Sequence, residues 1–108
     1  MMSASLDALV GARLAVSFPG TEATEAIIDQ LRLLHAQTLV IFSRNFTSPA
    51  QCRQLISDLE RAVGWRFLVM VDHEGGRVMR FASGVTHFPS AGVIGATCSP
   101  HEVERQGE

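Results

Sequence analysis

Three short runs of apolar residues divide the chain. Each run has the length of a β-strand, is rich in Val, Ile, Leu and Phe, and does not alternate between apolar and polar positions. Such continuity is typical of strands that are buried on both faces, as in a parallel sheet. The pattern therefore predicts three parallel strands, at residues 14–18, 39–42 and 67–71.

Amphipathic helical patterns lie between these predicted strands. In each pattern, apolar residues recur at spacings of three and four, which places them on one face of a helix. The first stripe comprises Ala23, Ile27, Leu31 and Leu34, and the second comprises Cys52, Leu55, Ile56, Leu59 and Val63.

The second helix has recognisable signals at both ends. Ser48 can cap its start, Pro49 suits its first position, Gln51 stands three residues after the cap, and Gly64 suits its end. A similar combination recurs at residues 99–102, S-P-H-E, with an acidic residue in place of the glutamine. A further helix is therefore predicted to begin there.

The predicted order is strand, helix, strand, helix, strand, then a long loop and the start of another helix. Strands begin 25 to 28 residues apart, which is the repeat of a parallel α/β protein. Right-handed crossovers would place both helices on one face of the sheet. The other face would leave Val and Ile in water, and a closed barrel usually needs about 250 residues. We therefore expect residues 1–108 to be a truncated portion of one domain, prone to poor solubility or self-association by itself.

Composition narrows the possible functions. Hydrophobic residues make up 46% of the chain, enough for one modest core, and the net charge of −2 does not favour a nucleic acid partner. No apolar run approaches the roughly 20 residues that span a bilayer. Asp7 and Arg13 interrupt the apolar N-terminal stretch, which is unlike a signal peptide, so we expect a cytoplasmic protein with no membrane partner. Cys52 and Cys98 lack metal-site spacing, and Cys52 is expected to be a small core residue.

Candidate functional residues are expected after the strands, because ligands of parallel α/β folds bind at the carboxyl ends of the strands. Arg44 follows the second predicted strand. It could meet an anionic substrate, but an arginine with several fixed hydrogen bonds more often organises a loop. The loop-organising interpretation is therefore favoured for Arg44.

The segment after the third predicted strand is the richest in chemistry. Asp72 directly follows the apolar run, and Gly75 and Gly76 allow a sharp turn that could bring Arg77 or Arg80 back over the strand end. A carboxylate beside a guanidinium suits vicinal sugar hydroxyls, because the carboxylate accepts hydrogen bonds and the guanidinium donates them. An internal ion pair that only shapes the loop is an equally good interpretation of the composition.

A metal site at this segment is a weaker hypothesis. Asp72, His73 and Glu74 are all potential ligands. Adjacent residues of an extended segment point in alternate directions, however, so three in a row converge poorly on one ion. The chain also contains no nucleotide-binding or serine hydrolase motif. We therefore expect no metal and no cofactor.

The segment resembles a known family. Residues 71–81, V-D-H-E-G-G-R-V-M-R-F, resemble the D-x-E-G-G-R-V-x-R-[FL] signature of family-three glycoside hydrolases. Residues 39–45 resemble the family's strand segment ending in F-x-R-N, and residues 48–51 resemble the helix start that follows. Residues 84–89, G-V-T-H-F-P, resemble the motif after the signature. The combination is most similar to the bacterial β-N-acetylhexosaminidase branch.

The resemblance implies a fold and a reaction. The fold would be an incomplete TIM-like (β/α) barrel in which this chain supplies the first three parallel strands, two helices and the start of a third. The activity implied is that of a retaining hydrolase, which removes terminal β-linked N-acetylglucosamine from peptidoglycan fragments in the cytoplasm. Its partner would be a small carbohydrate substrate that contains N-acetylglucosamine.

The resemblance also implies roles for particular residues. Asp72 and Arg80 would bind the terminal sugar. The loop scaffold would consist of Glu74, Gly75, Gly76, Arg77, Arg44 and Asn45, with Arg77 pairing locally.

The sequence departs from the family pattern in three ways. Residues 36–38, A-Q-T, stand where the family usually has glycines before its second strand. His73 and Met79 stand where the family commonly has Gln. The family's K-H-F-P-G-H loop, its His-Asp acid/base pair and its nucleophilic Asp lie downstream of the matched region and do not occur in these 108 residues. The chain is thus expected to hold no catalytic residue and to be inactive alone. A β-glucosidase-type exo-glycosidase and an inactive fragment remain the alternative hypotheses.

Overall fold

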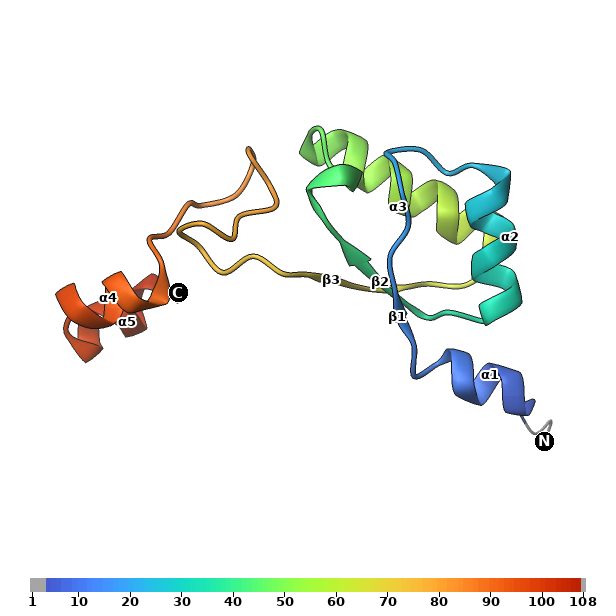
Figure 1. Cartoon of the computed structure of the whole chain (residues 1–108), viewed down its shortest axis with the longest axis horizontal. Helices are drawn as coiled ribbons and strands as arrows, with labels where there is room; N and C mark the ends of the chain where they lie inside the picture. The colour runs from blue at the N-terminus through green and yellow to red at the C-terminus, as the bar shows by residue number, and fades with distance from the viewer. Residues whose placement is uncertain (1–3, 108) are drawn as a thin grey trace.

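The computed structural model describes residues 4–107 and has an α/β architecture (Figure 1). Its elements are α1 (Leu6–Gly11), β1 (Ala15–Val16), α2 (Glu25–Leu34), β2 (Thr38–Ile41), the 3-10 helix η1 (Ser43–Asn45), α3 (Pro49–Val63), β3 (Leu68–Val71), α4 (Ala91–Thr97) and α5 (Pro100–Gln106).

The strands form one parallel sheet in the order β1-β2-β3, which confirms the prediction of three parallel strands. Thr38 of β2 is paired with Ala15 on one side and with Leu68 on the other. Each strand is shorter than or offset from its apolar run, and β1 comprises only two residues. Because the three strands run in one direction, their carboxyl ends lie along one edge of the sheet.

The core lies between the sheet and two helices. Figure 1 shows α2 and α3 on the same face of the sheet, as right-handed crossovers require. Both predicted stripes contribute to one cluster of buried side chains, in which Cys52 is the small core residue expected. Burial raises the pKa of the Cys52 thiol, and the nearby charge of Arg53 opposes this shift. The cluster consists of Phe18, Ile27, Ile28, Leu31, Ala36, Leu39, Ile41, Cys52, Leu55, Leu59 and Phe67.

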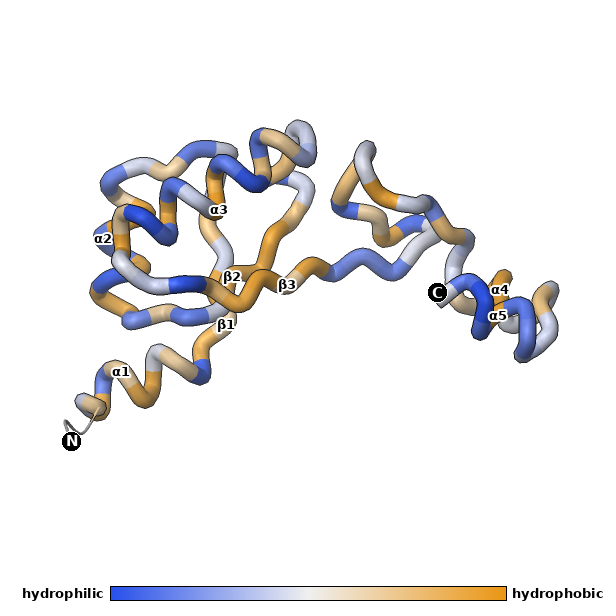
Figure 2. Tube along the Cα trace, turned by 180° about the vertical axis from the view of Figure 1, so that it is seen from behind, coloured by the Kyte–Doolittle hydropathy of each residue, from blue (hydrophilic) through white to orange (hydrophobic). Residues whose placement is uncertain are grey.

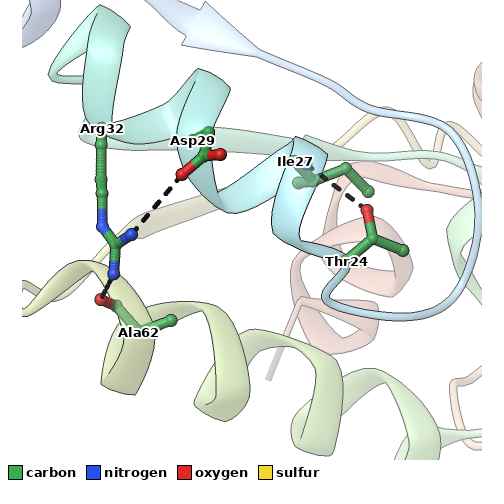
Figure 3. A network of polar contacts seen from close by, with 5 residues as sticks. All are labelled: Thr24, Ile27, Asp29, Arg32 and Ala62. Carbon is green, nitrogen blue, oxygen red and sulfur yellow. Dashed lines mark hydrogen bonds and ion pairs between the residues drawn. The ribbon is translucent and has the colours of Figure 1, made fainter.

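Polar contacts fix the start of α2 and join its end to α3 (Figure 3). The Thr24 hydroxyl caps α2 by accepting a hydrogen bond from the backbone N–H of Ile27 at 3.4 Å. Arg32 donates across the helix interface to the carbonyl of Ala62 at 2.6 Å. The same guanidinium lies 3.6 Å from the carboxylate of Asp29. These contacts hold α2 beside α3 at the rim of the core.

The predicted helix ends of α3 and α5 are confirmed. The Ser48 hydroxyl accepts from the backbone N–H of Gln51 at 3.1 Å, and Gly64 ends α3 with φ of 90°. At α5, Ser99 and Glu102 form a reciprocal capping box. The backbone N–H of Ser99 lowers the pKa of the Glu102 carboxyl, because the bond favours the ionised form.

Two helices were not predicted. α1 begins after Ser5, whose hydroxyl accepts from the N–H of Ala8, and α4 begins after Ser90, whose hydroxyl accepts from the N–H of Val93. They have only 6 and 7 residues, too few to display a full apolar stripe. The long loop expected before residue 99 is thus helical in part. No helix within residues 4–107 is long and apolar enough to cross a bilayer.

The predicted stripe of α2 was wrong at both ends. Ala23 packs against the core as expected, but it precedes the helix, because Thr24 is the helix cap. Leu34 is exposed, since the chain turns away at His35, which takes a left-handed conformation with φ of 48°. Ile28 takes a place in the core instead.

Strand β3 is one of the two edge strands of the sheet. Its four side chains, all apolar, are between 40% and 65% exposed, and Figure 2 shows this strand as a continuous hydrophobic segment. The radius of gyration is 17.3 Å, against about 13 Å for a compact domain of 100 residues. The excess arises because α4 and α5 lie apart from the sheet (Figure 1) and have no buried residue.

A polypeptide limited to residues 1–108 is expected to self-associate, because β3 offers both apolar side chains and a free backbone edge. Sedimentation velocity should show a sedimentation coefficient that rises with concentration. Leu68→Lys, which changes the most exposed side chain of β3 (65%), should reduce this rise. Leu33→Lys, on the outside of α2, is the matched control and should leave it unchanged. A monomer that melts sharply at every concentration would contradict the prediction.

Candidate functional site

The candidate residues lie where the strands end. Ile41 of β2 is paired with Val71 of β3, so the next residues, Phe42 and Asp72, follow neighbouring strand ends. Ser17 follows β1 at the same edge of the sheet. The parallel register therefore gathers the loops after all three strands into one region.

Asp72 and Arg80 form an ion pair in this region. The Nη2 atom of Arg80 lies 3.0 Å from Oδ2 of Asp72. Fully 44% of the Asp72 side chain and 30% of the Arg80 side chain are exposed, so a ligand can reach both. An ion pair this accessible adds little to the stability of a fold. Its remaining donors and acceptors can instead meet the hydroxyl groups of a ligand.

A tight turn returns the chain from Asp72 to Arg80. The backbone N–H of Glu74 donates to the carbonyl of Val78 at 2.8 Å, and the N–H of Val78 donates to the carbonyl of Gly75 at 3.2 Å. Gly75 and Gly76 have φ of 81° and 58°, a region that favours glycine. A Cβ atom on Gly75 would also lie 2.6 Å from the carbonyl oxygen of Pro89. The turn thus needs glycine for space as well as for conformation.

Aromatic rings support Arg80 and its loop. The Arg80 guanidinium carbon lies 5.4 Å from the centre of the Phe42 ring. The following residue, Phe81, stacks on Phe46 with the ring centres 4.4 Å apart. His73 accepts a hydrogen bond at Nδ1 from the backbone N–H of Arg80 at 3.1 Å. Sequence analysis did not assign the three phenylalanine rings to the site. The one sequence feature that could have indicated them is their position next to the candidate residues.

Arg44 joins the loop after β2 to the loop after β1. Its Nε donates to the carbonyl of Phe18 at 3.1 Å, and its Nη2 donates to the hydroxyl of Ser17 at 2.7 Å. Its guanidinium carbon also lies 4.8 Å from the centre of the Phe42 ring, on which Arg80 rests as well. These several fixed contacts are those of an arginine that organises a loop.

Asn45 makes the same connection from inside the protein. Its side chain is completely buried, and its Nδ2 donates to the carbonyls of Phe18 and Gly20, both at 2.8 Å. Its Oδ1 accepts from the backbone N–H of Phe42 at 3.0 Å. One side chain therefore satisfies three backbone groups that lie outside the strand ladder.

Gln51 is a structural residue whose full role sequence analysis missed. Its Nε2 donates to the carbonyls of Thr21 and Asn45 at 2.9 and 3.1 Å, and its Oε1 accepts from the N–H of Thr47 at 2.8 Å. The available signal was its position three residues after a helix cap, from which a glutamine can reach back to the preceding backbone.

Glu74 and Arg77 belong to the turn between Asp72 and Arg80 through their backbone alone. Their side chains are exposed and make no ion pair or hydrogen bond with any residue in the range 4–107. The local pairing expected for Arg77 is therefore absent from that range. Over the same residues, no group of three His, Cys, Asp or Glu is placed to hold a metal ion, so Asp72, His73 and Glu74 do not converge.

An open hollow of roughly 480 Å³ lies beside the Arg80 side chain. It is lined by Ser43, Phe46, Thr47, Met79, Arg80, Phe81, Ala82 and His87. A larger hollow of about 660 Å³ lies between α2 and α3 and shares none of these residues. The smaller hollow is lined by Arg80 of the ion pair, whereas the larger is lined by neither Asp72 nor Arg80, so we place the site at the smaller hollow.

Comparison with known proteins agrees with the sequence motifs. The family model described as the glycosyl hydrolase family 3 N terminal domain matches residues 6–108. The chain belongs to glycosyl hydrolase family 3. Among its family-three relatives is a β-hexosaminidase of Idiomarina loihiensis, which is 40% identical over 83 residues, or 77% of this chain and 25% of the relative.

Solved family-three structures share the fold. NagZ from Neisseria gonorrhoeae, in complex with N-trifluoroacetyl-D-glucosamine, matches with a TM-score of 0.69 and 29% identity over 77% of this chain and 24% of its own. A family 3 β-N-acetylglucosaminidase from Paenibacillus sp. str. FPU-7 matches with a TM-score of 0.78 and 30% identity over 87% and 19%. The expected partial α/β barrel is thus confirmed. The chain spans about a quarter of the length of the curated relatives it matches.

In this family-three chain, Gly75→Ala should destabilise the whole protein more than Gly64→Ala does. Both glycines have positive φ, 81° and 90°, so alanine at either position costs about 1 kcal/mol of backbone strain. Only at Gly75 would the new Cβ also meet backbone atoms, which should cost about 1–3 kcal/mol more. Urea denaturation measures the two free energies of unfolding. Equal losses would contradict the close approach at Gly75.

Proposed function

We propose that the whole protein hydrolyses terminal β-linked N-acetylglucosamine from peptidoglycan-derived sugars, and that this chain supplies part of the sugar-binding site. Asp72 and Arg80 hold the terminal sugar, and the turn at Gly75 and Gly76 keeps them together. The reaction requires no metal and no organic cofactor. The protein acts in the cytoplasm on small carbohydrate substrates.

The Asp72–Arg80 pair is the observation that carries this proposal. Neighbouring hydroxyl groups of a sugar ring each offer one donor and acceptor sites, and the carboxylate and guanidinium provide the complementary set. The two groups are 3.0 Å apart and partly exposed. They lie beyond the carboxyl end of β3, where parallel α/β folds bind ligands. An arrangement needed only for folding would gain little from such an accessible pair.

The relatives support an N-acetylated amino sugar as the substrate. The Idiomarina loihiensis relative is a β-hexosaminidase, the Paenibacillus structure is a β-N-acetylglucosaminidase, and the Neisseria gonorrhoeae structure holds N-trifluoroacetyl-D-glucosamine. Each of these names concerns a glucosamine-type or hexosamine sugar. We extend that substrate class to this protein.

We assign the catalytic groups to other segments of the whole protein. Retaining hydrolysis needs both a nucleophile and a separate acid/base group. Asp72 cannot fill both roles, and its carboxylate is engaged by Arg80. In the proposal this chain therefore binds and orients the sugar, while the reacting groups are supplied elsewhere.

A comparison of two chromogenic substrates tests the activity. The whole protein should hydrolyse p-nitrophenyl N-acetyl-β-D-glucosaminide with a much higher kcat/KM than p-nitrophenyl β-D-glucoside. Higher kcat/KM with the glucoside would favour the β-glucosidase-type alternative. No turnover of either substrate by a homogeneous preparation would contradict the proposal.

Asp72→Asn in the whole protein should lower kcat/KM by about ten-fold or more, because a charged acceptor of sugar hydroxyls is lost. Asp58→Asn is the matched control. Asp58 also pairs with an arginine, Arg61, at 3.2 Å, and its exposure of 38% is close to the 44% of Asp72, but it lies on α3. The control should stay within about two-fold of the unchanged protein. Equal kinetics for both variants would remove Asp72 from the binding site.

A further inference from the structure

The ion pair between Arg80 and Asp72 does not define the orientation of the guanidinium by itself. Only Nη2 bonds the carboxylate, at 3.0 Å, while Nε is buried and has no hydrogen-bond partner among residues 4–107. A two-pronged arginine–carboxylate pair fixes both position and angle, whereas a single bond leaves the angle free. Other contacts must therefore hold Arg80 in place.

Two contacts are available for this purpose. The Phe42 ring lies under the guanidinium, with 5.4 Å between the guanidinium carbon and the ring centre. His73 holds the other end of the residue, because its Nδ1 accepts from the backbone N–H of Arg80 at 3.1 Å. The ring supports the tip of the side chain, and the imidazole fixes the point from which that side chain starts.

The hydrogen bond from the Arg80 backbone also determines the tautomer of the neutral His73 imidazole. An Nδ1 atom that accepts a hydrogen bond carries no proton, so the neutral ring carries its proton on Nε2. Nε2 is buried and has no partner in the described part of the chain. The Phe81 ring lies beside the imidazole, with 5.8 Å between the ring centres. The Nδ1 bond is thus the polar contact that orients the His73 ring.

We propose that His73 is a positioning residue for sugar binding, which acts by fixing the backbone of Arg80. The inference rests on the proposed function, in which Arg80 binds the terminal sugar. The Nδ1 atom of His73 is occupied by the Arg80 N–H and its Nε2 atom is buried, so His73 acts through Arg80 and not by touching the substrate. Position 73 therefore requires an uncharged side chain whose acceptor atom can reach the Arg80 N–H, as the Nδ1 atom of His73 does.

This requirement separates two substitutions of the same residue. The amide oxygen of glutamine can accept from the Arg80 N–H, so His73→Gln should keep the arrangement. Alanine offers no acceptor, so His73→Ala should leave that N–H unpaired. In the whole protein, His73→Ala should raise KM for p-nitrophenyl N-acetyl-β-D-glucosaminide by about ten-fold with little change in kcat. His73→Gln should restore KM to within about two-fold of the original value.

A second background tests whether His73 acts through Arg80. Without the guanidinium there is nothing left to position, so adding His73→Ala to Arg80→Ala should not raise KM further. If His73 were purely structural, His73→Ala would raise KM by the same factor in the original protein and in the Arg80→Ala variant. Additive effects on KM, or failure of glutamine to rescue, would overturn the inference.

The outcomes also separate this inference from the proposed function. If Arg80→Ala leaves KM unchanged, the proposed sugar-binding role fails. If Arg80→Ala raises KM but His73→Ala does not, only the positioning role fails. A measurement without turnover completes the test. The ¹⁵N spectrum of histidine-labelled protein, with His73 assigned from its loss in His73→Gln, should show the proton on Nε2. A proton on Nδ1 would overturn the inference regardless of activity.

Discussion

The buried amide of Asn45 connects the carboxyl ends of β1 and β2, and the site depends on this connection. Its three hydrogen bonds reach the carbonyls of Phe18 and Gly20 and the N–H of Phe42. Since β1 has only two residues, the strand ladder alone does little to fix the loop that follows it. The amide extends the alignment beyond the strand. Because Phe42 then lies under Arg80, this buried polar group helps to set the geometry of the exposed ion pair.

Much of the fold could be predicted because short-range sequence patterns indicate its strands and helix ends. The apolar runs predicted three parallel strands, and Ser48, Gly64 and Ser99 marked helix ends that the structure confirms. The failures have physical causes. α1 and α4 are too short to carry a periodic signal, and Leu34 lost its place in the core because the chain turns away at the next residue. Tertiary context decides such positions, and a local pattern does not contain it.

Some contacts of the candidate site could also be predicted from the sequence, and others could not. A pairing of Asp72 with Arg77 or Arg80 could be expected in advance, because the two glycines after Asp72 allow the chain to double back, and the structure shows that the partner is Arg80. The contacts of Phe42 and Gln51 could not, because they join residues that are far apart in the sequence and are brought together only by the tertiary fold. The expected pairing of Arg77 is absent, since its side chain is exposed and makes no ion pair within residues 4–107. Sequence thus identified the chemistry of the ion pair better than the scaffold around it.

The separation of α4 and α5 from the core implies an uneven resistance to local opening along the chain. Residues of β2 are enclosed by neighbouring strands and by the apolar faces of α2 and α3. The two last helices have no buried residue, so their backbone hydrogen bonds are protected by little besides the helices themselves. Segments of this kind unfold locally at low free-energy cost. Amide hydrogens of α4 and α5 would therefore exchange with solvent long before those of β2, and the boundary would fall in the segment that carries Asp72 and Arg80.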